Sequence, residues 1–148
     1  MERGITAEQN FKNGCNCAQA VLAAFSDLTG LEEETAMRIA SGFGGGMARM
    51  REVCGAVSGM FMAAGLILGD DNVPSREHKA ALYAALQELA ARFREENGSL
   101  LCRELLAGVG AGQGGAPEER TERYYRKRPC AELCRCAAEL LEEYLRCR

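Results

Sequence analysis

Apolar residues recur at helical spacing along much of the chain, and turn and capping residues divide this pattern into segments. The clearest segment is a predicted helix over residues 76–96, whose apolar stripe runs through Leu82, Leu86, Leu89 and Phe93. No segment shows the sustained period-two alternation of β-branched or aromatic residues that a strand requires. The sequence therefore predicts an all-α protein, a bundle of about six or seven helices around a glycine-rich central helix.

Capping residues mark where most of the other predicted helices begin. These caps are a capping box at Thr6–Gln9, a second box at Asn16–Gln19, Ser99, and Pro129 in the first turn of the last helix. The helices predicted from them are a short one after Thr6, then residues 17–30, 32–40, 54–69, 100–106 and 130–146. Gly30, Gly69 and Gly98 mark helix ends.

The stretch Gly42–Gly69 is a glycine-dense loop that turns into an apolar helix, and Cys54 lies at the transition. Gly55, Gly59 and Ala63 recur every four residues, so we expect a neighbouring helix to approach this one closely and to bring its cysteines near. The glycine run lacks the Lys-Ser/Thr of a phosphate-binding loop and follows no strand, which disfavours nucleotide binding.

We predict a single helical redox-type domain over residues 1–148, interrupted by a flexible connection at 108–128 before the last helix. Gly108–Pro117 is rich in glycine and has no apolar pattern. Glu118–Arg128 is densely charged and is interpreted as a solvated segment. Arg49 and Arg51, beside the glycine run, could attract an anion, but we expect solvated or ion-paired side chains.

Composition and charge restrict the kinds of partner. Hydrophobic residues make up 47% of the chain and charged residues 26%, which is typical of a soluble globular protein. The net charge of −3 disfavours nucleic acid or an anionic membrane as the main partner. The N-terminus carries no signal pattern, and the longest apolar run, Val57–Leu68, is too short to span a bilayer. We therefore expect a cytoplasmic protein.

Eight cysteines and a single histidine make sulfur the only abundant candidate ligand. In a reducing compartment, this many cysteines favours metal ligation, redox chemistry or burial over disulfides. Four cysteines from four predicted helices fall in or near a first turn: Cys17, Cys54, Cys102 and Cys130. Because helix N-termini favour thiolate over thiol, we expect these four to have lowered pKa values.

The other cysteines have less distinctive positions. Cys15 could join a shared site only if it lies in the loop before the Asn16 cap. Cys134 follows Cys130 by one helical turn and is either a spare ligand or a resolving thiol. Cys136 and Cys147 lie on another face of the last helix and are interpreted as packing or surface thiols.

Five motifs in a fixed order carry a family resemblance. They are Asn16-Cys17-Ala18-Gln19-Ala20-Val21, Gly42-Phe43-Gly44-Gly45-Gly46-Met47, Cys54-Gly55-Ala56-Val57-Ser58-Gly59, Cys102-Arg103-Glu104-Leu105-Leu106 and Cys130. The chain resembles the C_GCAxxG_C_C family, small redox-active proteins found mostly in anaerobic prokaryotes. The resemblance implies redox activity, and it places the four family cysteines on Cys17, Cys54, Cys102 and Cys130. A similar domain occurs in split-Soret cytochromes, where an iron–sulfur cluster has been proposed.

Three functions stay open from the sequence. The first is a site formed by Cys17, Cys54, Cys102 and Cys130 for a small iron–sulfur cluster, or alternatively zinc, serving electron transfer with a donor or acceptor protein. The second is a metal-free thiol–disulfide oxidoreductase or redox sensor. The third is a structural or carrier module without catalysis. No general acid or base is apparent beside the thiols, so the sequence leaves open whether the protein is an enzyme.

Overall fold

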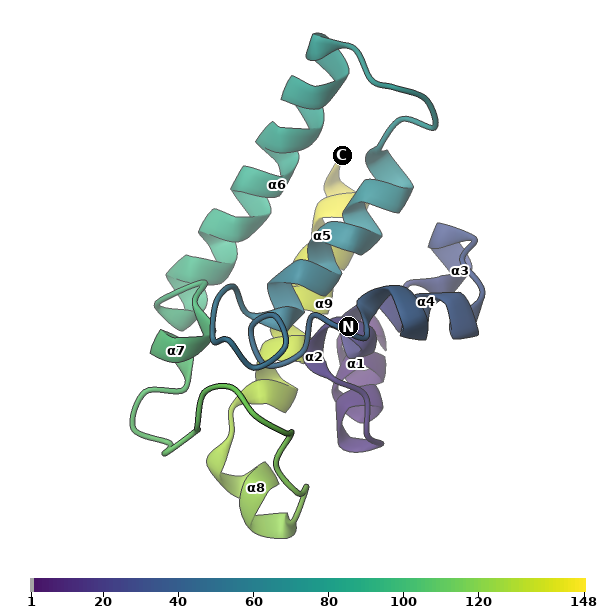
Figure 1. Ribbon diagram of the computed structural model, residues 1–148. Coiled ribbons are helices and arrows are strands. Elements are labelled where there is room, and N and C mark those ends of the chain that lie inside the picture. The colour runs from purple at the N-terminus through teal and green to yellow at the C-terminus, as the bar shows by residue number, and fades with distance from the viewer. Residues whose placement is uncertain (1) are drawn as a thin grey trace.

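The computed structural model describes residues 2–148, and nine helices account for its regular structure (Figure 1). In chain order they are α1 (Glu2–Lys12), α2 (Cys17–Ala23), α3 (Ser26–Thr29), α4 (Glu33–Ala40), α5 (Gly55–Leu68), α6 (Arg76–Asn97), α7 (Cys102–Leu105), α8 (Glu122–Lys127) and α9 (Cys130–Cys147). Residues 2–148 contain no strand, and an isolated antiparallel bridge joins Val53 to Leu101. The all-α prediction is confirmed, with more helices than predicted. Met1, the first residue of the predicted domain, lies outside the described residues.

Several predicted helix boundaries are confirmed by the hydrogen bonds at the caps. The Asn16 side chain accepts from the backbone N–H of Gln19 at 2.8 Å, and the Gln19 side chain accepts from the backbone N–H of Asn16 at 2.9 Å. This reciprocal pair is the capping box predicted for α2. At the other ends, α5 stops at Gly69 and α6 stops at Gly98, which takes the left-handed conformation.

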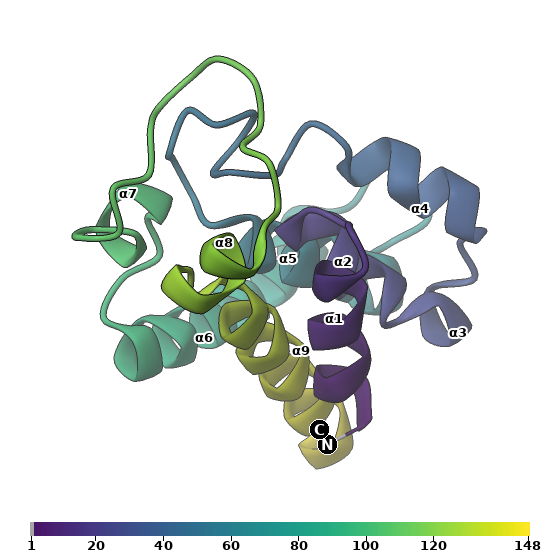
Figure 2. The same cartoon turned by 90° about the horizontal axis from the view of Figure 1, so that it is seen from below.

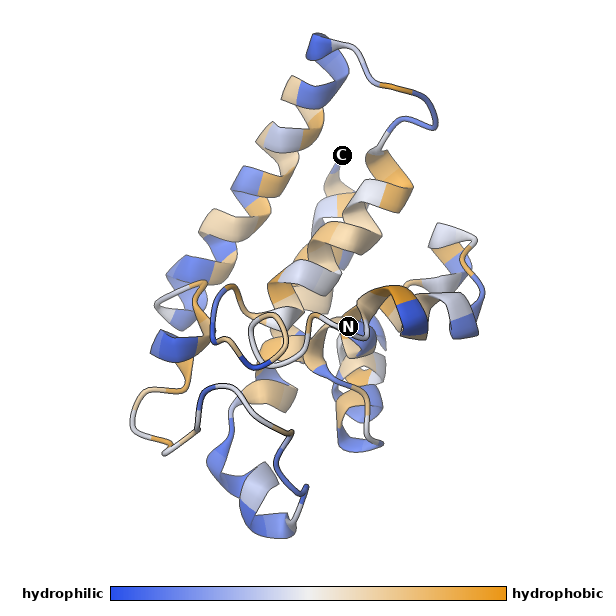
Figure 3. Cartoon of the chain, in the orientation of Figure 1, coloured by the Kyte–Doolittle hydropathy of each residue, from blue (hydrophilic) through white to orange (hydrophobic). Residues whose placement is uncertain are grey.

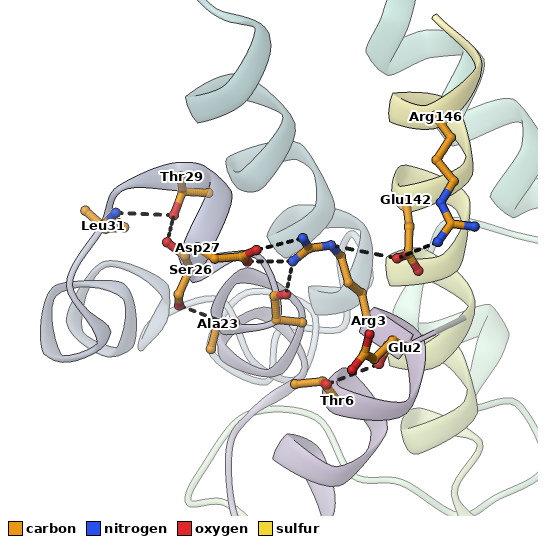
Figure 4. Close-up of polar contacts among 11 residues, drawn as sticks. Glu2, Arg3, Thr6, Ala23, Ser26, Asp27, Thr29, Leu31, Glu142 and Arg146 are labelled. Carbon is orange, nitrogen blue, oxygen red and sulfur yellow. Dashed lines mark hydrogen bonds and ion pairs between the residues drawn. The ribbon is translucent and has the colours of Figure 1, made fainter.

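Two predicted helix starts are wrong. The first helix, α1, begins at Glu2 rather than after Thr6, whose hydroxyl donates to the Glu2 carbonyl from inside the helix (Figure 4). Ser99 is not the cap of α7, because Leu101 occupies that position and Ser99 Oγ accepts from its backbone N–H. As a result, Cys102 is the first residue of α7 rather than the third.

The helix predicted over residues 17–30 is broken into α2 and α3. Phe25, at the break, is fully buried and has a non-helical backbone. The neighbouring Ala24 carbonyl accepts a hydrogen bond from Arg3 Nη1 at 2.9 Å. Arg3 also pairs with Asp27 at 2.6 Å and approaches Glu142 of α9 at 3.8 Å (Figure 4). A single arginine of α1 therefore connects α3 and α9.

The charged segment before the last helix makes specific contacts with distant parts of the chain. It contains α8, which Figure 3 shows as mostly hydrophilic. Arg120, just before α8, donates to the carbonyls of Phe11 and Cys15 at 2.6 and 2.8 Å. Arg128, just after it, is buried. Most side chains of Glu118–Arg128 are exposed, as predicted for a solvated segment, and Arg128 is the buried exception. The flexibility of residues 108–128 stays a prediction.

Half of the predicted apolar stripe on α6 reaches the core. Leu89 and Phe93 are fully buried, whereas Leu82 and Leu86 are partly exposed. The first half of α6 diverges from α5 and α9, as Figure 1 shows, so its apolar positions meet fewer neighbours. The stripe predicts the helix correctly but not the point along its length where packing begins.

Small residues on α5 allow α2 to pack closely against it. A β-carbon added at Gly59 would lie only 2.6 Å from the Ala18 carbonyl oxygen, and one at Gly55 would lie 3.0 Å from the β-carbon of Cys17. The predicted close approach at these two glycines is confirmed. Helices α9 and α6 also pack against α5, and α1 packs along α9. No helix within residues 2–148 combines the length and the apolar character needed to cross a membrane.

The Gly59 contact predicts a difference between two glycine substitutions in the same helix. Gly59→Ala should lower the free energy of unfolding by about 1–3 kcal/mol, because the added methyl group would overlap the α2 backbone. Gly65→Ala is the matched control, since nothing lies within 4 Å of its added methyl group. It should raise that free energy by about 0.5–1 kcal/mol. Urea unfolding measures the free energy of unfolding of both variants, and equal changes in the two would contradict the close packing at Gly59.

Candidate functional site

A cavity of about 310 Å³ lies where α2, α5, α7 and α9 begin, and four cysteines line it. They are Cys17, Cys54, Cys102 and Cys130, the four singled out in the sequence. Cys54 is the N-cap of α5, and each of the others is the first residue of its helix. All four are buried. Figure 2 looks onto the side of the molecule where α2, α7, α8 and the loop before α5 gather.

Glycines allow the cysteine-bearing segments to meet. A β-carbon added at Gly46 would lie 2.6 Å from the β-carbon of Cys102, as the one at Gly55 would crowd Cys17. Two backbone hydrogen bonds fix the same neighbourhood. The N–H of Cys54 donates to the Leu100 carbonyl at 2.8 Å, and the N–H of Cys102 donates to the Glu52 carbonyl at 2.7 Å. The start of α5 and the start of α7 are thereby held side by side.

The loop between α4 and α5 has an unusual left-handed backbone. Positive φ angles occur at Gly45, Gly46, Met47, Ala48, Arg49 and Arg51. A left-handed conformation costs a non-glycine residue roughly 1–2 kcal/mol. Strain of this kind persists only where surrounding contacts impose it, and it concentrates at functional sites. Here the contacts come from the chain after α7, since Gly114 N–H donates to the Arg49 carbonyl at 2.8 Å.

Arg51 is buried at the wall of the cavity. Its side chain donates from Nε to the Gly112 carbonyl at 2.8 Å, and Nη1 lies 3.5 Å from the sulfur of Cys102. The remaining nitrogen, Nη2, is buried without a hydrogen-bond partner among the described residues. The residue is 5% exposed, and its side-chain bonds go to a backbone carbonyl and a cysteine sulfur rather than to a carboxylate. The expectation of a solvated or ion-paired Arg51 is wrong, because chain segments distant in sequence close over it.

Three further arginines line the same cavity, together with one carboxylate. Arg49 and Arg128 both pair with Glu118, and Arg120 donates to backbone carbonyls. The predicted ion pair of Arg49 is confirmed. Arginine is always protonated in proteins. Four guanidinium groups against the single carboxylate of Glu118 leave the wall with three positive charges in excess.

Burial raises the pKa values of three cavity thiols. The pKa of Cys54 rises to about 12, mainly because burial removes water from the thiolate. A hydrogen bond with Cys17, followed by burial, raises the pKa of Cys130. The same bond lowers the pKa of Cys17, but its hydrogen bond with Cys134 and its burial outweigh this and raise that pKa overall. The predicted lowering at helix starts is wrong for these three, since burial at Cys54, and hydrogen bonds between thiols together with burial at Cys17 and Cys130, outweigh the effect of the helix ends.

The other cysteines do not line the cavity. Cys134 is fully buried next to Cys17, whose carbonyl lies 3.8 Å from its sulfur. Cys15 lies in the loop before α2, with its sulfur 3.8 Å from that of Met37. The remaining two are Cys136, which contacts Asn97 and Glu96, and Cys147, which is exposed. All eight cysteines are free thiols.

The side chains as they stand do not form the donor set of a single metal ion. Within residues 2–148, no three or more histidine, cysteine, aspartate or glutamate side chains are grouped in that way. The single histidine, His78, pairs with Asp70 at 2.6 Å and does not line the cavity. Any thiolate-bound group would therefore depend on the four cysteine sulfurs.

The sequence model of one protein family matches residues 15–144. Its description is "Putative redox-active protein (C_GCAxxG_C_C)". The chain belongs to the C_GCAxxG_C_C family. The matched range contains all four cavity cysteines, and the resemblance noted in the sequence is confirmed. Comparison with curated proteins and with solved structures found no match.

The sequence singles out Arg49 and Arg51 as residues that could attract an anion, but not Arg120 or Arg128, which complete the wall of the cavity. Arg120 and Arg128 lie in a charged run with no distinguishing pattern. Arg51 follows a glycine-rich loop, and only the fold shows that its side chain is buried. An arginine that lies between a glycine run and a family cysteine, as Arg51 does, is the sequence signal that could identify such a buried arginine.

The raised pKa of Cys54 predicts slow alkylation in the folded, metal-free protein. At pH 8 its thiolate fraction should be about a thousandfold smaller than that of an unperturbed thiol. The rate of modification by iodoacetamide should rise about tenfold per pH unit between pH 7 and 10. Mass spectrometry of timed samples measures the rate, with exposed Cys147 as the fast internal reference. Rapid labelling of Cys54 at pH 7 would contradict the assigned shift.

Proposed function

We propose that this member of the C_GCAxxG_C_C family is an electron-transfer protein that holds a small iron–sulfur cluster on Cys17, Cys54, Cys102 and Cys130. The observation that carries the proposal is that these four thiols, from four different helices, line one cavity. When bound, such a cluster supplies one-electron transfer at a potential set by its ligands and surroundings. The family description supports redox activity in general.

The donor set fits an iron–sulfur cluster by its chemistry. Cysteinate is the usual ligand of these clusters, and no histidine lines the cavity. The excess positive charge of the wall offsets the negative charge of four thiolates. Because each cysteine is buried at the start of a helix, the protein excludes most water from the sulfurs and fixes the directions from which they approach.

The grouping of the sulfurs bears on the choice between a cluster and zinc. Four sulfurs on one zinc ion at 2.3 Å would lie about 3.8 Å from one another. The thiols here do not form a single-ion set. A cluster distributes its ligands over several metal atoms, so it suits more widely spaced sulfurs. Zinc in the same four-cysteine site is therefore the second choice for the bound group.

A metal-free thiol–disulfide oxidoreductase or sensor is the alternative function that one contact favours. Cys17 hydrogen-bonds to both Cys130 and Cys134, so a pair of these thiols is near enough for exchange after small movements. The raised pKa values oppose it, since an attacking cysteine needs thiolate character. A structural or carrier role without catalysis has no specific support.

We place the protein in the cytoplasm, with a donor or acceptor protein as its electron partner. Eight free thiols, including exposed Cys147, suit a reducing compartment. The family resemblance to proteins of anaerobes agrees with a site that oxygen would damage.

Anaerobic purification or reconstitution with iron and sulfide tests the proposal. The wild-type protein should contain about two or four iron atoms per chain, with matching acid-labile sulfide and visible absorption. Cys54→Ser should lose most of the iron and the colour, because serine is a poor ligand for these clusters. Cys147→Ser is the matched control and should retain both, since Cys147 is exposed and does not line the cavity.

The same samples separate the alternatives. A colourless wild-type protein with no iron, zinc or labile sulfide, but with titratable thiols, would overturn the cluster proposal. Zinc without iron would favour the zinc site. Oxidation of two thiols to a disulfide that a mild reductant reverses would favour the thiol–disulfide function.

A further inference from the structure

The geometry points to a binding site for a small oxyanion at Arg51, in the cavity that the four cysteines line. The ligand class is an inorganic anion of about the size of nitrate or sulfate that enters from solvent. This inference goes beyond the proposed function and concerns the protein without a cluster, because a cluster on the four cysteines would occupy the same cavity.

The charge of the cavity is the first support. The chain as a whole carries a net charge of −3, yet the cavity is lined by four arginines and by a single carboxylate, that of Glu118. The positive charge is thus concentrated around a hollow in an otherwise acidic protein. A hollow of this kind attracts anions and raises their local concentration. The same charge repels free cations.

The surroundings of Arg51 are the second support. A buried guanidinium is costly unless its charge is compensated and its donors are hydrogen-bonded. Glu118 pairs with Arg49 and Arg128, whereas the bonds of Arg51 go to the Gly112 carbonyl and towards the Cys102 sulfur. Nη2 has no acceptor among the described residues and almost no accessible surface of its own. Because Arg51 lines the cavity through other atoms, a molecule bound there would lie beside this side chain and supply the missing negative charge.

The size and the wall of the cavity suit a small anion. A volume of about 310 Å³ corresponds to about ten water molecules in the liquid, so a small oxyanion fits with room to spare. The planar guanidinium offers paired donors that match two oxygens of one anion. Backbone hydrogen bonds hold Arg51 in place, since its N–H donates to the Gly45 carbonyl at 3.2 Å and its carbonyl accepts from Arg103 Nε at 3.0 Å.

Titration of the iron-free, reduced protein with sulfate and with nitrate tests the inference. Both probes are inert towards thiols under these conditions, and calorimetry in a low-chloride buffer measures their affinity. Wild-type protein should bind at least one probe with a dissociation constant of about 1 mM or tighter. Arg51→Gln should weaken binding at least about tenfold, because it removes a charge-assisted hydrogen bond. Arg51→Lys keeps the charge but not the paired donors, so its affinity should lie between those of wild type and Arg51→Gln.

Arg126→Gln is the matched control for charge. Arg126 is exposed on α8 and does not line the cavity, so its loss should change the affinity by less than about twofold. The NMR signal of the Arg51 Nε–H in wild-type protein gives a readout that needs no folded variant. It should shift on saturation with the bound probe and be missing from Arg51→Lys.

Two results would overturn the anion site. One is no binding of either probe by wild-type protein up to about 10 mM. The other is binding that does not involve Arg51, shown by equal affinities of wild type and Arg51→Gln or by an unchanged Arg51 NMR signal when the probe saturates the wild-type protein. Iron and sulfide contents are measured on separate, reconstituted samples. A failure to assemble a cluster therefore leaves the anion result standing, and the reverse also holds.

Discussion

Close backbone contact at glycines is the constraint on which the site depends. At Gly46, Gly55 and Gly59, a β-carbon would come within 3.0 Å of Cys102, Cys17 or the α2 backbone. These contacts set how near α2, the α5 start and α7 can lie to one another. The cavity and its four thiols are a consequence of that spacing rather than of any local sequence motif. Glycine here is chosen for the absence of a side chain, because Gly55 and Gly59 lie within a regular helix.

Burial dominates the electrostatics of the site. Helix starts favour negative charge by up to about 2 kcal/mol, which is about one and a half pKa units. The removal of water from Cys54 opposes this and raises its pKa by about three units, to about 12. Cys17, Cys54 and Cys130 thus favour the neutral thiol, while four arginines line the same wall. The cavity therefore has a net positive charge when nothing is bound, and gains most from an occupant that is negative.

Sequence patterns predict the parts of this protein that depend on neighbouring residues. The cap at Asn16, the stop at Gly69 and the first-turn positions of the cysteines follow from local hydrogen bonds and periodicity. The break at Phe25 and the burial of Arg51 depend on partners far along the chain, namely Arg3 and Gly112. Local patterns contain no information on such partners. The family cysteines, Arg49 and Arg51 were recognisable in the sequence, but Arg120 and Arg128 were not.

The distribution of the four cysteines along the chain has a consequence for assembly. Cys17 lies near one end of the chain and Cys130 near the other, so any fragment that contains the whole proposed ligand set spans at least residues 17–130. Sites made from closely spaced cysteine pairs can capture a metal on an unfolded segment, whereas this one requires the tertiary structure first. Binding free energy at such a site is shared with the folding equilibrium of the entire domain. The occupant would thus act as a long-range clamp that joins the first and last thirds of the polypeptide.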